Sequence, residues 1–129
     1  MLTFNLKKEW FEKIKRGEKT HEYREVKDFW TDRFVKEFFP VDKKTNLKIF
    51  NNVKEGMLNA LNNPIKTELR IKNVKICFMN GMEKEEKRPR LYGKMKSIKI
   101  VNGLQTDLKI NKPVYDIEFE LISKKLRGE

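Results

Sequence analysis

The sequence predicts an α+β domain: a small, mostly antiparallel β-barrel of five or six strands with two or three flanking helices. Three observations lead to this class. Several short stretches alternate apolar and polar residues, as half-buried strands do. Other stretches repeat apolar residues at helical spacing. Pro and Asn-Gly signals separate these stretches, and 129 residues suit one domain, 1–129, with one modest core.

The first third of the chain predicts two strands and two helices. Residues 2–6 alternate as a strand, and residues 8–16 carry the apolar stripe of a short helix. A second strand begins at Thr20. Residues 28–39 then form an unusually aromatic helix that Pro40 ends. We expect this helix to cover one open end of the sheet.

The remaining elements are one helix and several strands. Residues 52–62 share an apolar helical face, and two short strands are expected within residues 69–78. Residues 91–101 predict a long strand whose alternation changes phase near Ser97, which indicates a bulge. Residues 115–121 alternate cleanly and predict the last strand.

The charge of the chain favours a polyanionic partner. Thirty Lys and Arg residues stand against nineteen Asp and Glu, a formal net charge of +11. Nucleic acid or an acidic membrane surface would suit this excess, although a lysine-rich surface also serves solubility. The lone Cys77 and lone His21 cannot build the usual zinc site, so we expect no metal and no cofactor. Without an apolar run of membrane-spanning length, we expect no membrane partner and a cytoplasmic location.

A polar cluster is predicted where the first helix passes into the second strand. Gly17 can close the helix in the left-handed conformation. Strand alternation then places Glu22 and Arg24 on one face, just beyond Lys19. Such a cluster can hold an anion or a polar base edge, or it can tune the pKa of the lysine. The alternative is a surface ion-pair ladder.

These residues also carry a resemblance to a known family. Gly-x-Lys-x-x-Glu-x-Arg, at residues 17–24, resembles the signature of the ASCH (activating signal cointegrator homology) domain, small bacterial and phage type, within the PUA-like superfamily. Residues 6–11, 78–81, 88–89 and 115–117 are similar to other parts of that family. The segment from about 40 to 73 has no counterpart, and is either a lid over the site or an insertion. The resemblance implies a PUA-like pseudo-barrel.

The resemblance implies binding of RNA or of a modified nucleotide or nucleoside in a cleft beside the signature. Some small ASCH proteins are amidohydrolases that deacetylate acetylated cytidine, using the signature lysine, a nearby threonine and a glutamate elsewhere. A relative is described as a ribonuclease. Lys19 matches the lysine, but Glu22 occupies the place of the threonine. If the chain is an enzyme, Lys19 and Glu22 are its catalytic candidates.

The candidate ligand-binding residues combine this cluster with other cations and planar groups near the matching segments: Lys7, Lys19, Glu22, Arg24, Trp30, Asn80, Arg88 and Arg90. Residues 84–99 add a basic stretch that could follow phosphates. A third possibility is a protein-interaction module that uses the aromatic segment 29–39.

Overall fold

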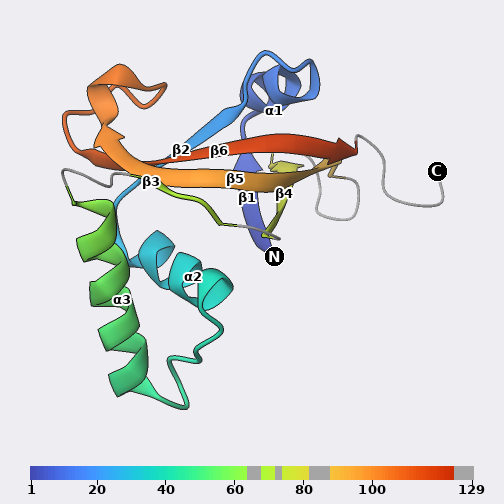
Figure 1. Cartoon of the computed structure of the whole chain (residues 1–129). Helices are drawn as coiled ribbons and strands as arrows, with labels where there is room; N and C mark the ends of the chain where they lie inside the picture. The colour runs from blue at the N-terminus through green and yellow to red at the C-terminus, as the bar shows by residue number, and fades with distance from the viewer. Residues whose placement is uncertain (64–67, 72–73, 82–87, 124–129) are drawn as a thin grey trace.

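The computed structural model describes residues 1–63, 68–71, 74–81 and 88–123. Within them the chain forms three α-helices, six strands and one turn of 3₁₀ helix at Gly103–Gln105. The elements follow one another in the order β1 (Leu2–Leu6), α1 (Lys8–Lys15), β2 (His21–Glu25), α2 (Asp28–Phe38), α3 (Leu47–Leu61), β3 (Glu68–Leu69), β4 (Lys75–Asn80), β5 (Arg90–Asn102) and β6 (Pro113–Ser123). Figure 1 shows their arrangement.

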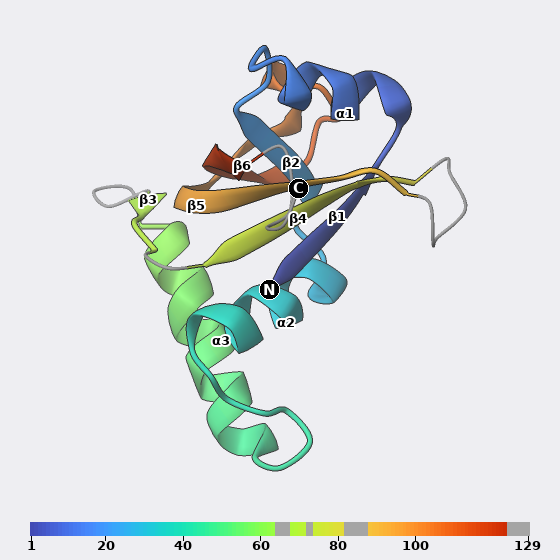
Figure 2. The same ribbon diagram turned by 90° about the vertical axis from the view of Figure 1, so that its right-hand side faces the viewer.

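The strands form one curled sheet in the order β1-β4-β5-β6-β2, with β3 added beside β5. Among the described strands β1 and β4 pair in parallel, and the other pairs are antiparallel. The sheet curls into a half-barrel, with α1 on one side and α2 and α3 on the other (Figures 1 and 2). The predicted α+β class is confirmed, with a mixed sheet.

The start of the third helix and the irregularity in the long strand can both be explained from the sequence. The third helix begins at Leu47, earlier than the predicted residue 52, because the side chain of Asn46 accepts a hydrogen bond from the Ile49 backbone at 3.1 Å. The predicted bulge in the long strand is confirmed, since the β5–β6 register shifts between Met95 and Ser97. The shift keeps apolar side chains on the buried face across the irregularity.

Aromatic rings join α2 to the sheet. Phe34 is fully buried and meets Tyr115 of β6 edge to face, with ring centroids 4.8 Å apart. The Tyr115 hydroxyl lies 2.5 Å from the Thr31 hydroxyl, and burial raises the pKa of this tyrosine. Most of the aromatic stripe of α2 therefore packs in the core.

The described part of segment 40–73 packs against α2. Phe50, Met57 and Leu61 of α3 are buried. Lys54 of α3 lies 2.8 Å from Asp32 of α2. Burial raises the pKa of Asp32, but the hydrogen bonds and charges of Lys54 and Lys43 together lower it further, so the net shift is downward. α3 is therefore attached to α2 by both apolar and charged contacts. No described helix combines the length and apolar character needed to cross a bilayer.

Candidate functional site

The turn between α1 and β2 places Lys19. Gly17 adopts φ 78°, and its N–H donates to the Ile14 carbonyl at 3.0 Å, so the predicted left-handed helix end is confirmed. The next N–H groups fold back on α1: both Glu18 and Lys19 donate to the Lys13 carbonyl, at 2.9 and 3.2 Å. The backbone of Lys19 is thus fixed to the helix before the strand begins.

The Lys19 ammonium lies among two carboxylates and two aromatic rings. It is 3.7 Å from Glu22 Oε1 and forms an ion pair with Asp107, in the loop between β5 and β6. Its side chain is only 8% exposed. The ring centroids of Tyr23 and Trp10 lie 4.9 and 5.5 Å from Nζ. Two carboxylates compensate this charge, which favours a donor role for the lysine.

Arg24 connects the two end strands of the sheet. Its Nη2 donates to Glu22 Oε2 at 2.9 Å and to the Asn5 carbonyl of β1 at 3.2 Å. The guanidinium lies 5.0 Å from the Phe4 ring centroid and 4.9 Å from that of Trp30. Its Nε is buried without a hydrogen-bond partner among the described residues. We call these contacts the Arg24 bridge.

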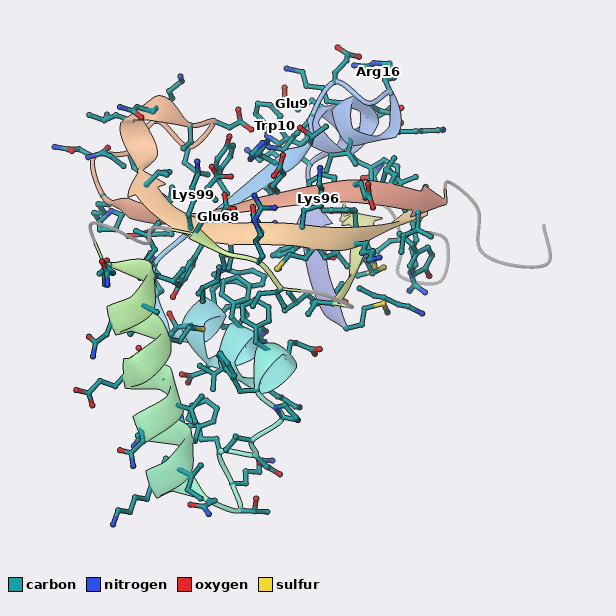
Figure 3. All side chains as sticks on the ribbon, in the orientation of Figure 1. Glu9, Trp10, Arg16, Glu68, Lys96 and Lys99 are labelled. Atoms are coloured by element: carbon teal, nitrogen blue, oxygen red, sulfur yellow. The ribbon has the colours of Figure 1, made fainter. Side chains whose placement is uncertain are left out.

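These side chains line a cleft of about 520 Å³, here called the Lys19 cleft. It lies between α1, the ends of β1 and β2, and the loop after β5. Figure 3 shows Glu9 and Trp10 on the side of α1 that faces this loop. The lining residues are Asn5, Leu6, Lys7, Glu9, Trp10, Lys19, Glu22, Tyr23, Arg24, Glu25, Asp107, Leu108 and Ile110.

The charges in the Lys19 cleft are balanced. Three cationic and four acidic side chains line it, so it is not a basic pocket in an otherwise basic protein. Desolvation, and then the nearby carboxylates of Asp116, Asp107 and Glu22, raise the pKa of Tyr23, so its hydroxyl keeps its proton at neutral pH. Donors and acceptors beside aromatic faces suit a polar, uncharged planar group better than a phosphate.

The predicted site residues are only partly brought together. Lys7, Lys19, Glu22 and Arg24 line the Lys19 cleft. Trp30 lies behind Arg24 and lines a neighbouring cleft instead.

The other predicted residues lie in β4, at the start of β5 and just before it, and they line neither cleft. Asn80 is buried at the end of β4, beside Leu6 of β1. Arg90 is exposed at the start of β5, and Arg88 is half-buried just before it. Part of the basic stretch 84–99, residues 84–87, lies outside the described residues.

Sequence reasoning missed Asp107. Asp107 comes from a loop far from the signature in sequence, and no local pattern marks it. Trp10 lies on the apolar stripe of α1 and packs partly against the core, but it is half-buried and lines the cleft, whereas Phe11 and Ile14 are buried. Lys13 follows Trp10 by three residues and therefore lies on the same side of the helix, which could have indicated a partly exposed indole. In the structure its Nζ lies 4.8 Å from the centroid of the Trp10 ring.

Among the described residues, no group of three or more His, Cys, Asp or Glu side chains is placed to hold a metal ion. Comparison with protein-family models, with curated proteins and with solved structures gave no match in any of the three.

Proposed function

We propose that this chain is an RNA- or modified-nucleotide-binding domain of the ASCH type, with a PUA-like fold, and that a nucleobase enters the Lys19 cleft. One observation carries the proposal: Lys19, Glu22 and Arg24 of the signature converge on one cleft, beside two aromatic side chains. The cleft volume of about 520 Å³ is within the usual range of small-ligand pockets. The resemblance of the signature and the half-barrel shape support the same assignment.

The proposal specifies a base rather than a phosphate as the group that is read. Lys19 and Arg24 supply donors, and Glu22 and Asp107 supply acceptors, so a base edge with both kinds of group can be matched. Trp10 and Tyr23 offer ring faces on which a base can stack. The net charge of +11 attracts the polyanion from a distance.

Catalysis is the alternative, as an amidohydrolase on acetylated cytidine or as a ribonuclease. An amidohydrolase of the resembled type needs a hydroxyl near the lysine. Here Glu22 takes that place, and its carboxylate, which accepts from the Tyr23 N–H and from Arg24, supplies no hydroxyl. Thr20 is exposed and lines a shallower depression beside His21 rather than the Lys19 cleft. These observations support binding over turnover.

A protein-interaction module has less support. The third hypothesis needs an apolar face on segment 29–39, but Phe34 and Val35 are fully buried, and Phe38 and Phe39 are half-buried against the core. Phe29 is the exposed aromatic residue of the segment, and an isolated exposed ring does not make an apolar patch.

Binding can be tested with two adjacent lysines. Lys7 lines the Lys19 cleft, whereas Lys8 is also exposed but does not line it. Fluorescence anisotropy with labelled single-stranded RNA should show weaker binding for Lys7→Ala than for the control Lys8→Ala. Tyr23→Ala should weaken binding by about 1–3 kcal/mol if a base stacks on the ring. Absence of RNA and nucleoside binding by the wild type, or equal effects of the two lysine changes, would refute the proposal.

Turnover is tested in parallel. The wild type and Lys19→Ala are incubated with short RNA and a panel of acylated nucleosides, and the products are read by mass spectrometry. We expect no product from either protein. A product that appears with the wild type and not with Lys19→Ala would replace the binding function by an enzymatic one, and the product mass would name the reaction.

A further inference from the structure

A second, larger cleft of about 860 Å³ adjoins the Lys19 cleft. It is formed by the start of β1, by α2, and by residues 41–44, which join α2 to α3. Figure 2 shows the N-terminal end of β1 lying beside α2. Asn5 and Arg24 line both clefts, so the two clefts adjoin at the Arg24 bridge. We call this second cleft the α2 cleft.

The α2 cleft has the positive charge that the Lys19 cleft lacks. Five cationic side chains line it against three acidic ones. Each of the three carboxylates is already engaged: Asp32 by Lys43 at 2.9 Å, Glu37 by the Met1 amine at 2.9 Å, and Asp42 by a backbone N–H at 2.8 Å.

Three exposed cations of this cleft have no carboxylate partner among the described residues, namely Arg33, Lys36 and Lys44. Their charges are therefore available to an anionic ligand. They come from both α2 and the α2–α3 connection, so the positive charge is distributed over two elements. A distributed positive charge suits the phosphates of a strand better than one point charge does.

The same wall carries an exposed stacking platform. Phe29 is 56% exposed, and the Arg33 guanidinium lies 3.5 Å from its ring centroid. Trp30 meets Phe29 edge to face at 5.1 Å. Aromatic rings and guanidinium planes are the surfaces on which unpaired bases stack, and stacking of this kind is tolerant of sequence.

We infer that the α2 cleft holds the nucleotides next to the one whose base enters the Lys19 cleft, so the ligand is single-stranded RNA and not a free nucleoside. The inference rests on the proposed function. The two clefts then have different roles. The Lys19 cleft, in which cationic and acidic side chains nearly balance, recognises a base, and the basic α2 cleft binds the flanking phosphates and stacks a neighbouring base. The inference also gives segment 40–73 a role, since Lys43 and Lys44 are part of this wall.

The test compares two double variants. Lys36→Ala/Lys44→Ala removes two available cations of the α2 cleft, and Lys15→Ala/Lys48→Ala removes two lysines that are also exposed but line neither cleft. Binding of a labelled RNA octanucleotide is measured over a range of salt. The slope of log Kd against log salt should fall by about 1.4 in the first variant, roughly 0.7 for each lost phosphate contact, and stay unchanged in the control. Phe29→Ala should weaken binding at least about fivefold.

The outcomes separate the two proposals. Binding of a mononucleotide to the wild type tests the Lys19 cleft alone, and if neither the mononucleotide nor the octanucleotide binds, the proposed function fails. If both bind but the two double variants have equal salt slopes, the inference is overturned and the proposed function stands. A poly-glutamate peptide that competes as well as RNA would overturn it too, because the cleft would then recognise acidic chains in general.

Discussion

Replacing Arg24 with methionine should lower the free energy of unfolding, because Arg24 joins the two end strands of the sheet. The change removes the hydrogen bond to the Asn5 carbonyl of β1 and the charged bond to Glu22, at 3.2 and 2.9 Å, while it retains much of the apolar stem. A hydrogen bond to a charged group contributes about 1.5–3 kcal/mol, and the contacts with the Phe4 and Trp30 rings contribute further. Because the side chain is 23% exposed, we discount for solvent and expect a loss of about 3 kcal/mol.

Urea denaturation followed by tryptophan fluorescence measures this loss. Thermal unfolding should show a Tm lower by about 10 °C, since a domain of this size loses roughly 3–4 °C per kcal/mol. Arg16→Met is the control, because Arg16 pairs with Glu18 on an exposed surface and should leave stability unchanged. A double variant with Glu22→Gln should lose less than the sum of the single changes. A loss below about 0.5 kcal/mol for Arg24→Met would refute the bridge.

Two further predictions concern stability. The pKa of Asp32 in the folded protein lies below its ordinary value of 3.8, so the stability that this carboxylate contributes is complete above pH 3.8 and is lost as the pH falls through the folded pKa. The pKa of Lys54 in the folded protein lies above its ordinary value of 10.5, so the stability that this ammonium contributes is lost only as the pH rises through the folded pKa. The stability difference between the wild type and Asp32→Asn should therefore be constant near neutral pH and shrink in acid, and a difference that persists in acid would contradict the assignment. Gly56→Ala should stabilise by about 0.5–1 kcal/mol, because a Cβ there meets nothing within 4 Å, whereas Gly103→Ala should cost about 1–3 kcal/mol, because its Cβ would lie 2.6 Å from the Ile110 carbonyl oxygen. The urea denaturation midpoints of the two glycine variants check these values, and equal shifts of the two midpoints would contradict the packing argument.

Local sequence patterns predicted those features of the site that depend on residues close together in the chain. The left-handed Gly17 follows from a glycine at a helix end, and the shared face of Glu22 and Arg24 follows from strand alternation; the structure confirms both. The bulge near Ser97 could be predicted for the same reason, because a change of phase is visible in the residues themselves. Membership of the ASCH family stays a prediction.

The parts that depend on strand partners could not be predicted from one sequence. Alternation tells which side chains share a face, but not which strand lies alongside, so the parallel pairing of β1 with β4 was not foreseen. Asp107 pairs with Lys19 only because the loop between β5 and β6 lies beside α1 in the folded chain. Trp30 was expected at the base pocket from its closeness in sequence, but the Arg24 side chain stands between the two.

The sheet order has a consequence for how the chain is made. β1 and β2 are synthesised early, yet their partners are β4 and β6: Leu2 pairs with Ile76, and His21 with Glu118. Until β6 has left the ribosome, β2 has no strand on which to fold, and the aromatic side chains of α2 lack Tyr115. Until then the nascent chain carries an unpaired strand and uncovered aromatic rings, features that favour aggregation of a growing chain. Pairing of β6 with β2 and β5 therefore completes the described part of the sheet last.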